Sequence, residues 1–233
     1  MVQEMDRPRQ LPLDFSHAPG YSRDDLVVSP ANEEAVALID RWPEWPAPVM
    51  VLSGPTGAGK THLAAIWRSL SGAVSLRADD LSQTVGSLDA RPVLLDDVDG
   101  AVIDENGLFH LINHVRANGS HLLMTARRFP SAWGVRLPDL VSRLTAAPTV
   151  EIHEPDDMLL AGVITKLFAD RQIEVDLAVV QYLVRRIERS LATAIRVVEK
   201  LDRMALEEHS RITRALAAEA VSAMDEGQGE LGF

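Results

Sequence analysis

The sequence contains no cysteine among its 233 residues. Disulfide bonds and thiolate metal sites are therefore excluded, and the composition suits the reducing cytosol. The sequence also lacks a run of about 18 apolar residues, which a membrane-spanning helix needs. Its N-terminal segment, Met1 to Gln10, is polar and charged, without the apolar stretch of a secretory signal. We therefore expect a cytoplasmic protein that has no membrane partner.

Positive charge is also scarce, with 23 Lys and Arg residues against 34 Asp and Glu residues and a formal net charge of -11. A protein that binds nucleic acid mainly by neutralising phosphates carries the opposite sign. We therefore expect no strong direct DNA binding. The hydrophobic content of 46% fits a folded chain, and the length allows one large domain and one small domain.

A glycine-rich segment follows a short apolar run at residues 49–53, which predicts a buried strand. The segment matches the phosphate-binding P-loop pattern and precedes a predicted helix that begins at Lys60. Backbone N–H groups of such a loop surround the β-phosphate, the lysine reaches the β- and γ-phosphates, and the final hydroxyl ligates Mg²⁺. We predict that ATP or ADP, with Mg²⁺, binds at Gly54, Pro55, Thr56, Gly57, Ala58, Gly59, Lys60 and Thr61.

Two further apolar runs predict strands that end in polar residues. Residues 92–95 lead into Asp96 and Asp97, residues 121–124 lead into Thr125, and the segment between them is typical of a helix. Strands that alternate with helices indicate a parallel sheet, whose ligands collect at the carboxyl ends of the strands. We predict that Asp96 holds Mg²⁺, that Asp97 orients the attacking water, and that Thr125 touches the γ-phosphate or that water. The alternative is a pair of solvated acids before a turn.

The chain changes character after Pro155, where apolar stripes at helical spacing are the only pattern. The expected fold class is α/β, a P-loop NTPase with a parallel sheet flanked by helices and followed by a small all-α lid domain. The expected divisions are a flexible tail at 1–22, a nucleotide-binding domain at 23–154, a helical lid at 155–225 and a frayed end at 226–233.

The predicted tail contains one apolar segment, which runs from Gln10 to Phe15. In an extended peptide its two leucines and its aromatic ring could enter an apolar groove on a partner. Equally, these side chains could fold back on the domain, and the pattern alone leaves both interpretations open.

The P-loop, the strand ending in two aspartates and residues 108–113 resemble the AAA+ family of the bacterial replication initiator DnaA and its short homologue Hda. The resemblance extends from about Leu26 to Met224. Residues 27–32 are similar to the adenine-side segment of this family, which implies that Val28 and Asn32 bind nucleotide. The P-loop match continues through His62, which the resemblance also assigns to the nucleotide site. Residues 124–130 resemble the sensor strand that carries Thr125.

Two arginines gain a role only from this resemblance. Residues 142–144 resemble the family's arginine-finger box, which implies that Arg143 reaches the γ-phosphate of a neighbouring protein. Arg196 corresponds to the lid arginine that contacts the chain's own nucleotide, with Arg189 as the alternative. Most arginines form surface ion pairs, and that interpretation stays open for each. The family often carries a second arginine four residues before the finger, but this chain has Asp139 there, which puts an initiator-type assembly in doubt.

The family's longer members continue into a DNA-reading domain, whereas this sequence ends soon after the lid, so the resemblance implies the Hda type. The Hda type carries a clamp-binding peptide near its N-terminus, which implies that role for Gln10, Leu11, Leu13 and Phe15. The implied function is regulatory inactivation: the protein binds the sliding clamp and uses Arg143 to promote hydrolysis of DnaA-bound ATP.

The resemblance implies weak or no autonomous ATPase activity. The alternatives are a helicase loader of the DnaC type and an autonomous ATPase. Whether the chain is a monomer or a homodimer stays open.

Overall fold

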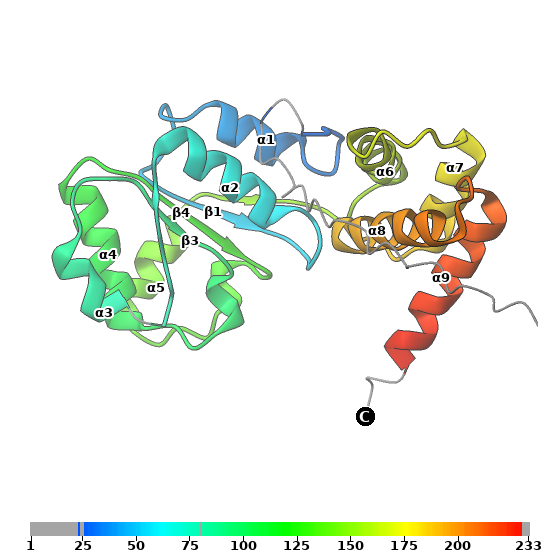
Figure 1. Ribbon diagram of the computed structural model, residues 1–233. Helices are drawn as coiled ribbons and strands as arrows, with labels where there is room; N and C mark the ends of the chain where they lie inside the picture. The colour runs from blue at the N-terminus through cyan, green and yellow to red at the C-terminus, as the bar shows by residue number, and fades with distance from the viewer. Residues whose placement is uncertain (1–22, 24–25, 80, 230–233) are drawn as a thin grey trace, which may run out of the picture.

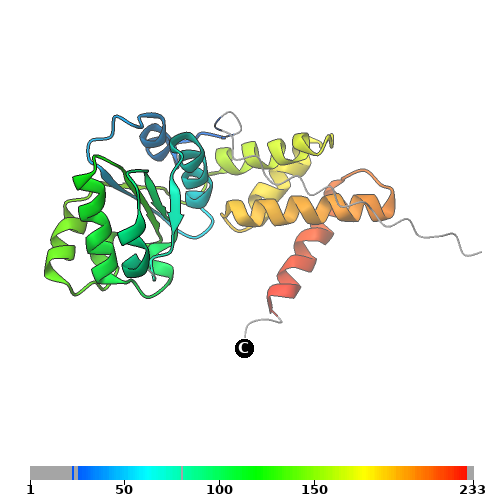
Figure 2. The same ribbon diagram turned by 60° about the vertical axis from the view of Figure 1, so that its left-hand side comes forward.

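The computed structural model describes residues 23, 26–79 and 81–229. These residues form an α/β part and an all-helical part that lie side by side (Figure 1). A view turned by 60° shows the same two parts and the helix at the C-terminal end projecting from the helical part (Figure 2). The architecture confirms the expected fold class.

The α/β part is built on a five-stranded parallel sheet in the order β2-β3-β4-β1-β5. The sequence predicts three of its strands, because they are apolar and buried on both faces. It does not predict β2 or β5, which are three residues long and only partly buried. The strands are β1 Val49–Ser53, β2 Val74–Leu76, β3 Val93–Leu95, β4 Leu122–Ala126 and β5 Thr149–Glu151.

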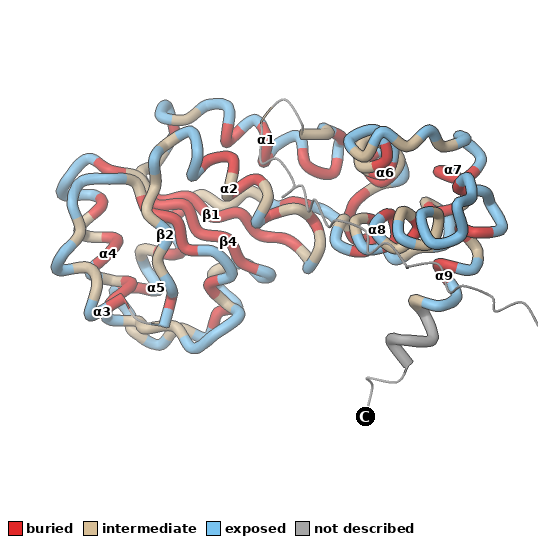
Figure 3. Tube along the Cα trace, viewed as in Figure 1, coloured by how far each residue is buried: buried red, intermediate tan, exposed pale blue. Residues whose placement is uncertain are grey.

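Alternate residues of the strands pack into two separate cores, one on each face of the sheet. The central strands are buried along their length (Figure 3). In β1, Val49 and Val51 face one core, whereas Met50 and Leu52 face the other. Helices α1 Glu33–Asp40 and α2 Lys60–Ser71 cover the core on the Met50 side. The opposite core lies under α3 Leu81–Thr84, α4 Glu105–Ala117 and α5 Pro138–Thr145.

The helical part has its own core, as its apolar stripes predict. Three of its helices begin at side chains that cap free backbone N–H groups, Asp156, Asp176 and Ser190. Its last helix extends to Gly229, and the predicted fraying of the end at 226–233 stays a prediction. The helices are α6 Asp157–Asp170, α7 Leu177–Arg186, α8 Leu191–Glu208 and α9 Arg214–Gly229.

Two expectations concern the ends of the chain and the membrane. The predicted clamp-binding peptide from Gln10 to Phe15 lies outside the residues that the structure describes, so it stays a prediction. Among the described residues, every helix is too short or too polar to cross a bilayer.

The core of the helical part provides a stability test. Phe168 on α6 is fully buried, whereas Met158 on the same helix is 57% exposed. We expect Phe168→Ala to lower the free energy of unfolding by about 3–5 kcal/mol, because it removes apolar contacts and leaves a cavity. Urea denaturation measures this change, with Met158→Ala as the control that stays within about 0.5 kcal/mol of the unmodified chain. Equal effects of the two substitutions would contradict the packing described here.

Candidate functional site

The P-loop connects β1 to α2 at the carboxyl edge of the sheet. Gly57 and Gly59 both have left-handed backbones, with φ angles of 78° and 99°, which side chains disfavour. A Cβ atom at Gly57 would also lie 2.1 Å from the Ser190 hydroxyl oxygen, at the start of α8. Glycine at this position therefore permits both the shape of the loop and its close contact with the helical part.

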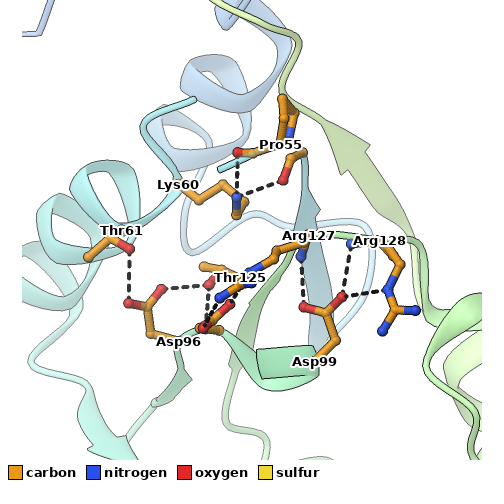
Figure 4. Close-up of polar contacts among 10 residues, drawn as sticks. Pro55, Lys60, Thr61, Asp96, Asp99, Thr125, Arg127 and Arg128 are labelled. Carbon is orange, nitrogen blue, oxygen red and sulfur yellow. Dashed lines mark hydrogen bonds and ion pairs between the residues drawn. The ribbon is translucent and has the colours of Figure 1, made fainter. Parts of the chain in front are cut away.

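Lys60 opens α2 and is buried against the loop that precedes it. Its Nζ donates to the carbonyl oxygens of Gly54 (2.6 Å) and Pro55 (2.8 Å) (Figure 4). Burial lowers the pKa of Lys60, although the nearby carboxylates of Asp97 and Asp99 oppose this change. The loop thus holds a partly dehydrated cation, which is the group that a P-loop presents to phosphates.

Two hydroxyl groups converge on the Asp96 carboxylate. Thr61 donates to one oxygen at 3.0 Å and Thr125 donates to the other at 2.5 Å (Figure 4). Leu95 of β3 pairs with Met124 of β4. The residues that follow them in the sequence, Asp96 and Thr125, therefore lie at the same edge of the sheet. Thr125 itself lies inside β4 rather than after its end.

These oxygens fit Mg²⁺, which prefers hard oxygen ligands and keeps several waters while it binds one or two carboxylates and the substrate phosphates. Thr61 and Asp96, which already share a hydrogen bond, would hold the ion. The described residues contain no group of three or more His, Asp or Glu side chains suited to a metal. These residues therefore do not form a metal site made of protein ligands alone.

Asp97 does not lie free beside this cluster. Its backbone is left-handed, with φ of 53°, and its N–H donates to the Thr125 hydroxyl at 2.9 Å. Its carboxylate forms a two-point ion pair with Arg127, at 3.2 and 3.0 Å. The sequence interpretation missed Arg127. The available signal was charge complementarity, because two successive arginines follow Thr125 and face the acids that follow β3.

Asp99 fixes the backbone of that arginine pair. Its side chain is only 1% exposed and accepts from the backbone N–H groups of Arg127 (2.8 Å) and Arg128 (3.1 Å) and from the Arg128 guanidinium (Figure 4). Burial alone would raise the pKa of Asp99, but these donors outweigh burial and lower it. The turn after β3 and the exit from β4 are therefore tied together.

The helical part touches the P-loop through the start of α8. The Leu191 N–H donates to the Gly57 carbonyl oxygen at 2.8 Å. Arg196 lies farther along this helix and donates to the Thr193 hydroxyl at 3.0 Å. The alternative lid arginine, Arg189, pairs instead with Asp157 at 2.7 Å. Arg196 therefore stays our prediction for the lid contact.

The predicted adenine-side residues lie before α1. Asn32 is buried, and its amide accepts from the Ser29 N–H (2.8 Å) and donates to the Val27 carbonyl oxygen (2.9 Å). These bonds hold the segment that presents Val28, which is 42% exposed. His62 is half-buried on α2, directly after the P-loop. The nucleotide contacts of these residues stay predictions.

Arg143 lies on α5, and its guanidinium sits over the ring of Phe109 on α4, 4.8 Å from the ring centre. This contact fixes a cation by the electrostatic attraction of the aromatic face. Among the residues that the structure describes, Arg143 forms no salt bridge, so none of them supports the interpretation of Arg143 as half of a surface ion pair.

Sequence comparisons connect the chain to replication proteins. Residues 163–218 match the family model described as Hda, lid domain. An uncharacterized protein of Haemophilus influenzae is 27% identical over 71% of this chain and 78% of its own length. The initiator DnaA of Sphingopyxis alaskensis is 28% identical over 92% of this chain, and that of Thermomicrobium roseum is 25% identical over 87%. The chain spans about half the length of these two DnaA proteins, 54% and 50%.

Solved structures share the fold. Domain III of Thermotoga maritima DnaA superposes with a TM-score of 0.76 at 18% identity, covering 88% of this chain and 97% of that domain. A DnaA bound to AMPPCP and single-stranded DNA gives a TM-score of 0.68 at 20% identity, covering 82% of this chain and 68% of that one. A Thermotoga maritima RuvB variant also gives 0.68, at 18% identity, covering 87% of this chain and 72% of that one. The lid match and the DnaA relatives, together with this shared fold, support an AAA+ protein of the Hda/DnaA type.

Proposed function

We propose that this chain is a nucleotide-binding regulator of the replication initiator DnaA, which it inactivates by promoting hydrolysis of DnaA-bound ATP. The observation that carries the proposal is the match of its helical part to the Hda lid domain, because that part contacts a complete P-loop. The relatives that are named DnaA support a partner of the same family, and AAA+ proteins act on the nucleotides of neighbouring subunits through arginine fingers.

The chain's own site binds ATP or ADP with Mg²⁺. Lys60 provides the positive charge for the phosphates, and the loop's backbone N–H groups cradle them. Thr61 and Asp96 are placed side by side for the metal ion, and Thr125 holds Asp96 in orientation. Two DnaA structures that share the fold contain AMPPCP, which supports a nucleotide ligand here. The bound nucleotide orders the P-loop against α8.

Arg143 acts on the nucleotide of the partner. Its described contact is with Phe109 of α4 rather than with the chain's own P-loop, which supports a role outside the chain's own site. A guanidinium there would neutralise charge that develops on the oxygens of the transferred phosphoryl group. Contact with the Phe109 ring already restricts the long Arg143 side chain. Less conformational entropy is therefore lost when it enters the partner's site.

The apolar segment in the N-terminal tail attaches the protein to the sliding clamp in the cytoplasm. Leu11, Leu13 and Phe15 supply apolar groups for a groove, and Gln10 supplies an amide for hydrogen bonds. The negative net charge of -11 opposes a strong direct hold on DNA. Tethering through the clamp would therefore bring the regulator to replicated DNA, where it meets DnaA.

The first test concerns the nucleotide site. Lys60→Ala should weaken ADP binding by about a hundredfold, because it removes charge-assisted hydrogen bonds to the phosphates. The increase in melting temperature on adding ADP should disappear with it. Isothermal titration measures the affinity, with Lys200→Ala on α8 as the control that keeps it. Unchanged affinity in Lys60→Ala would remove the nucleotide site from this proposal.

The second test concerns the finger. Arg143→Ala should keep ADP affinity and folding but lower the rate of hydrolysis of DnaA-bound ATP by about a thousandfold in a mixture with clamp-loaded DNA. Arg143→Lys should be nearly as defective, because lysine keeps the charge but lacks the planar fork of donors.

Arg116→Ala, an exposed position on the neighbouring helix α4, is the control for the finger test and should hydrolyse at the unmodified rate. Full hydrolysis with either Arg143 variant would exclude the finger role. Loss of activity together with a lower melting temperature would instead assign Arg143 a structural role against Phe109.

The third test concerns the tail. Combined replacement of Gln10, Leu13 and Phe15 by alanine should reduce binding to immobilised clamp by at least about tenfold, because the apolar anchors are lost. ADP affinity should stay unchanged in this variant. Gln3→Ala in the same tail is the matched control. Unaltered clamp binding by the triple variant would separate the tail from the clamp and leave the finger proposal standing.

A further inference from the structure

Asp97 is the residue that we expect to orient or activate water on the chain's own nucleotide, yet both of its carboxylate oxygens are already engaged. Arg127 Nε lies 3.2 Å from one oxygen and a terminal guanidinium nitrogen lies 3.0 Å from the other. Such a bidentate pair adds geometric specificity to the attraction between the two charges. A base must hydrogen-bond the water that it activates, so the pair opposes this function.

The backbone holds both members of the pair in place. The Asp97 N–H donates to the Thr125 hydroxyl at 2.9 Å, and the Arg127 N–H donates to the buried Asp99 carboxylate at 2.8 Å. The Asp97 carboxylate also lies over the turn that follows it, since a Cβ atom at Gly100 would come within 2.2 Å of its Oδ2. The backbone of the turn after β3 therefore helps to hold the pair, although both side chains are about half exposed, at 53% for Arg127 and 47% for Asp97.

We propose that Arg127 restrains hydrolysis of the chain's own nucleotide by holding Asp97 in an ion pair. In the restrained reaction, water attacks the γ-phosphorus while the bond from that phosphorus to the bridging oxygen breaks, giving ADP and inorganic phosphate. The proton that the water loses passes to the Asp97 carboxylate and then to solvent. The guanidinium hydrogen-bonds both carboxylate oxygens, so it competes with that water for them.

This inference rests on the proposed function and explains how it could work. A regulator that acts with Arg143 on a partner benefits from a nucleotide that stays intact in its own site. Asp97 would then serve as a fixed counter-charge for Arg127, while Thr61 and Asp96 keep their places for the metal ion.

The opposite role for Arg127 makes an opposite prediction. Burial lowers the pKa of Lys60, and the Arg127 charge adds to that effect although the neighbouring acids oppose both, so the two cations influence each other. If Arg127 served mainly to stabilise the phosphates during hydrolysis, its removal would slow the reaction. The sign of the change in rate therefore decides between the two roles.

The experiment is single-turnover hydrolysis of Mg-ATP by the purified full chain alone, at ATP concentrations that saturate each variant by isothermal titration. Arg127→Ala and Arg127→Gln should each hydrolyse ATP about tenfold faster than the unmodified chain. This increase is part of the roughly 10²–10⁴-fold acceleration in rate that a positioned general base provides. Adding Asp97→Asn to Arg127→Ala should return the rate to the unmodified level or below. Disruption of the fold cannot produce an increase that depends on Asp97.

Arg128→Ala is the matched control, because Arg128 belongs to the same exit from β4 but pairs with Asp99 rather than with Asp97. It should leave the rate unchanged. Saturable ATP binding with an unchanged or lower rate in both Arg127 variants would overturn the inference and leave the action on DnaA untouched. Failure of the unmodified chain to bind ATP would overturn the inference and the proposed nucleotide site together.

Discussion

The Asp96 carboxylate is the point on which the candidate site depends. It accepts one hydroxyl from α2 and one from β4 while it extends from the end of β3, so it joins three elements that are far apart in the sequence. A parallel sheet makes this meeting possible, because every strand delivers its last residue to the same edge. The buried strands fix that edge, and the two hydroxyls fix the carboxylate.

The two parts of the chain also touch at this edge. The Gly57 carbonyl oxygen accepts from the first residue of α8, and the absence of a side chain at Gly57 lets Ser190 approach. Any ligand that changes the path of the P-loop therefore acts on the lid helix directly. In our proposal this contact lets a nucleotide order the two-part arrangement as well as fill a site.

Two arginines of the α/β part are held in contrasting ways. Arg127 is neutralised by Asp97 beside the chain's own P-loop, whereas Arg143 rests over an aromatic ring without a salt bridge among the described residues. A cation held by an aromatic face loses less on moving to a phosphate than a cation held by a carboxylate. The contrast fits a chain that acts on a partner's nucleotide more than on its own.

The sequence alone determined the fold class, the buried strands β1, β3 and β4, the helices α2 and α4, the helical character of the lid and the P-loop, because apolar period and glycine placement are local signals. It did not reveal β2 and β5, whose three residues carry mixed burial and whose strand character comes from pairing with a neighbour. The sequence assigned different roles to the two aspartates after β3 but did not reveal their partners. The tertiary structure provides these partners, because Asp96 faces hydroxyls from α2 and β4 while Asp97 turns back toward Arg127. A side chain's partners depend on strand register and backbone turn, and residues about 30 positions apart carry no local sign of either.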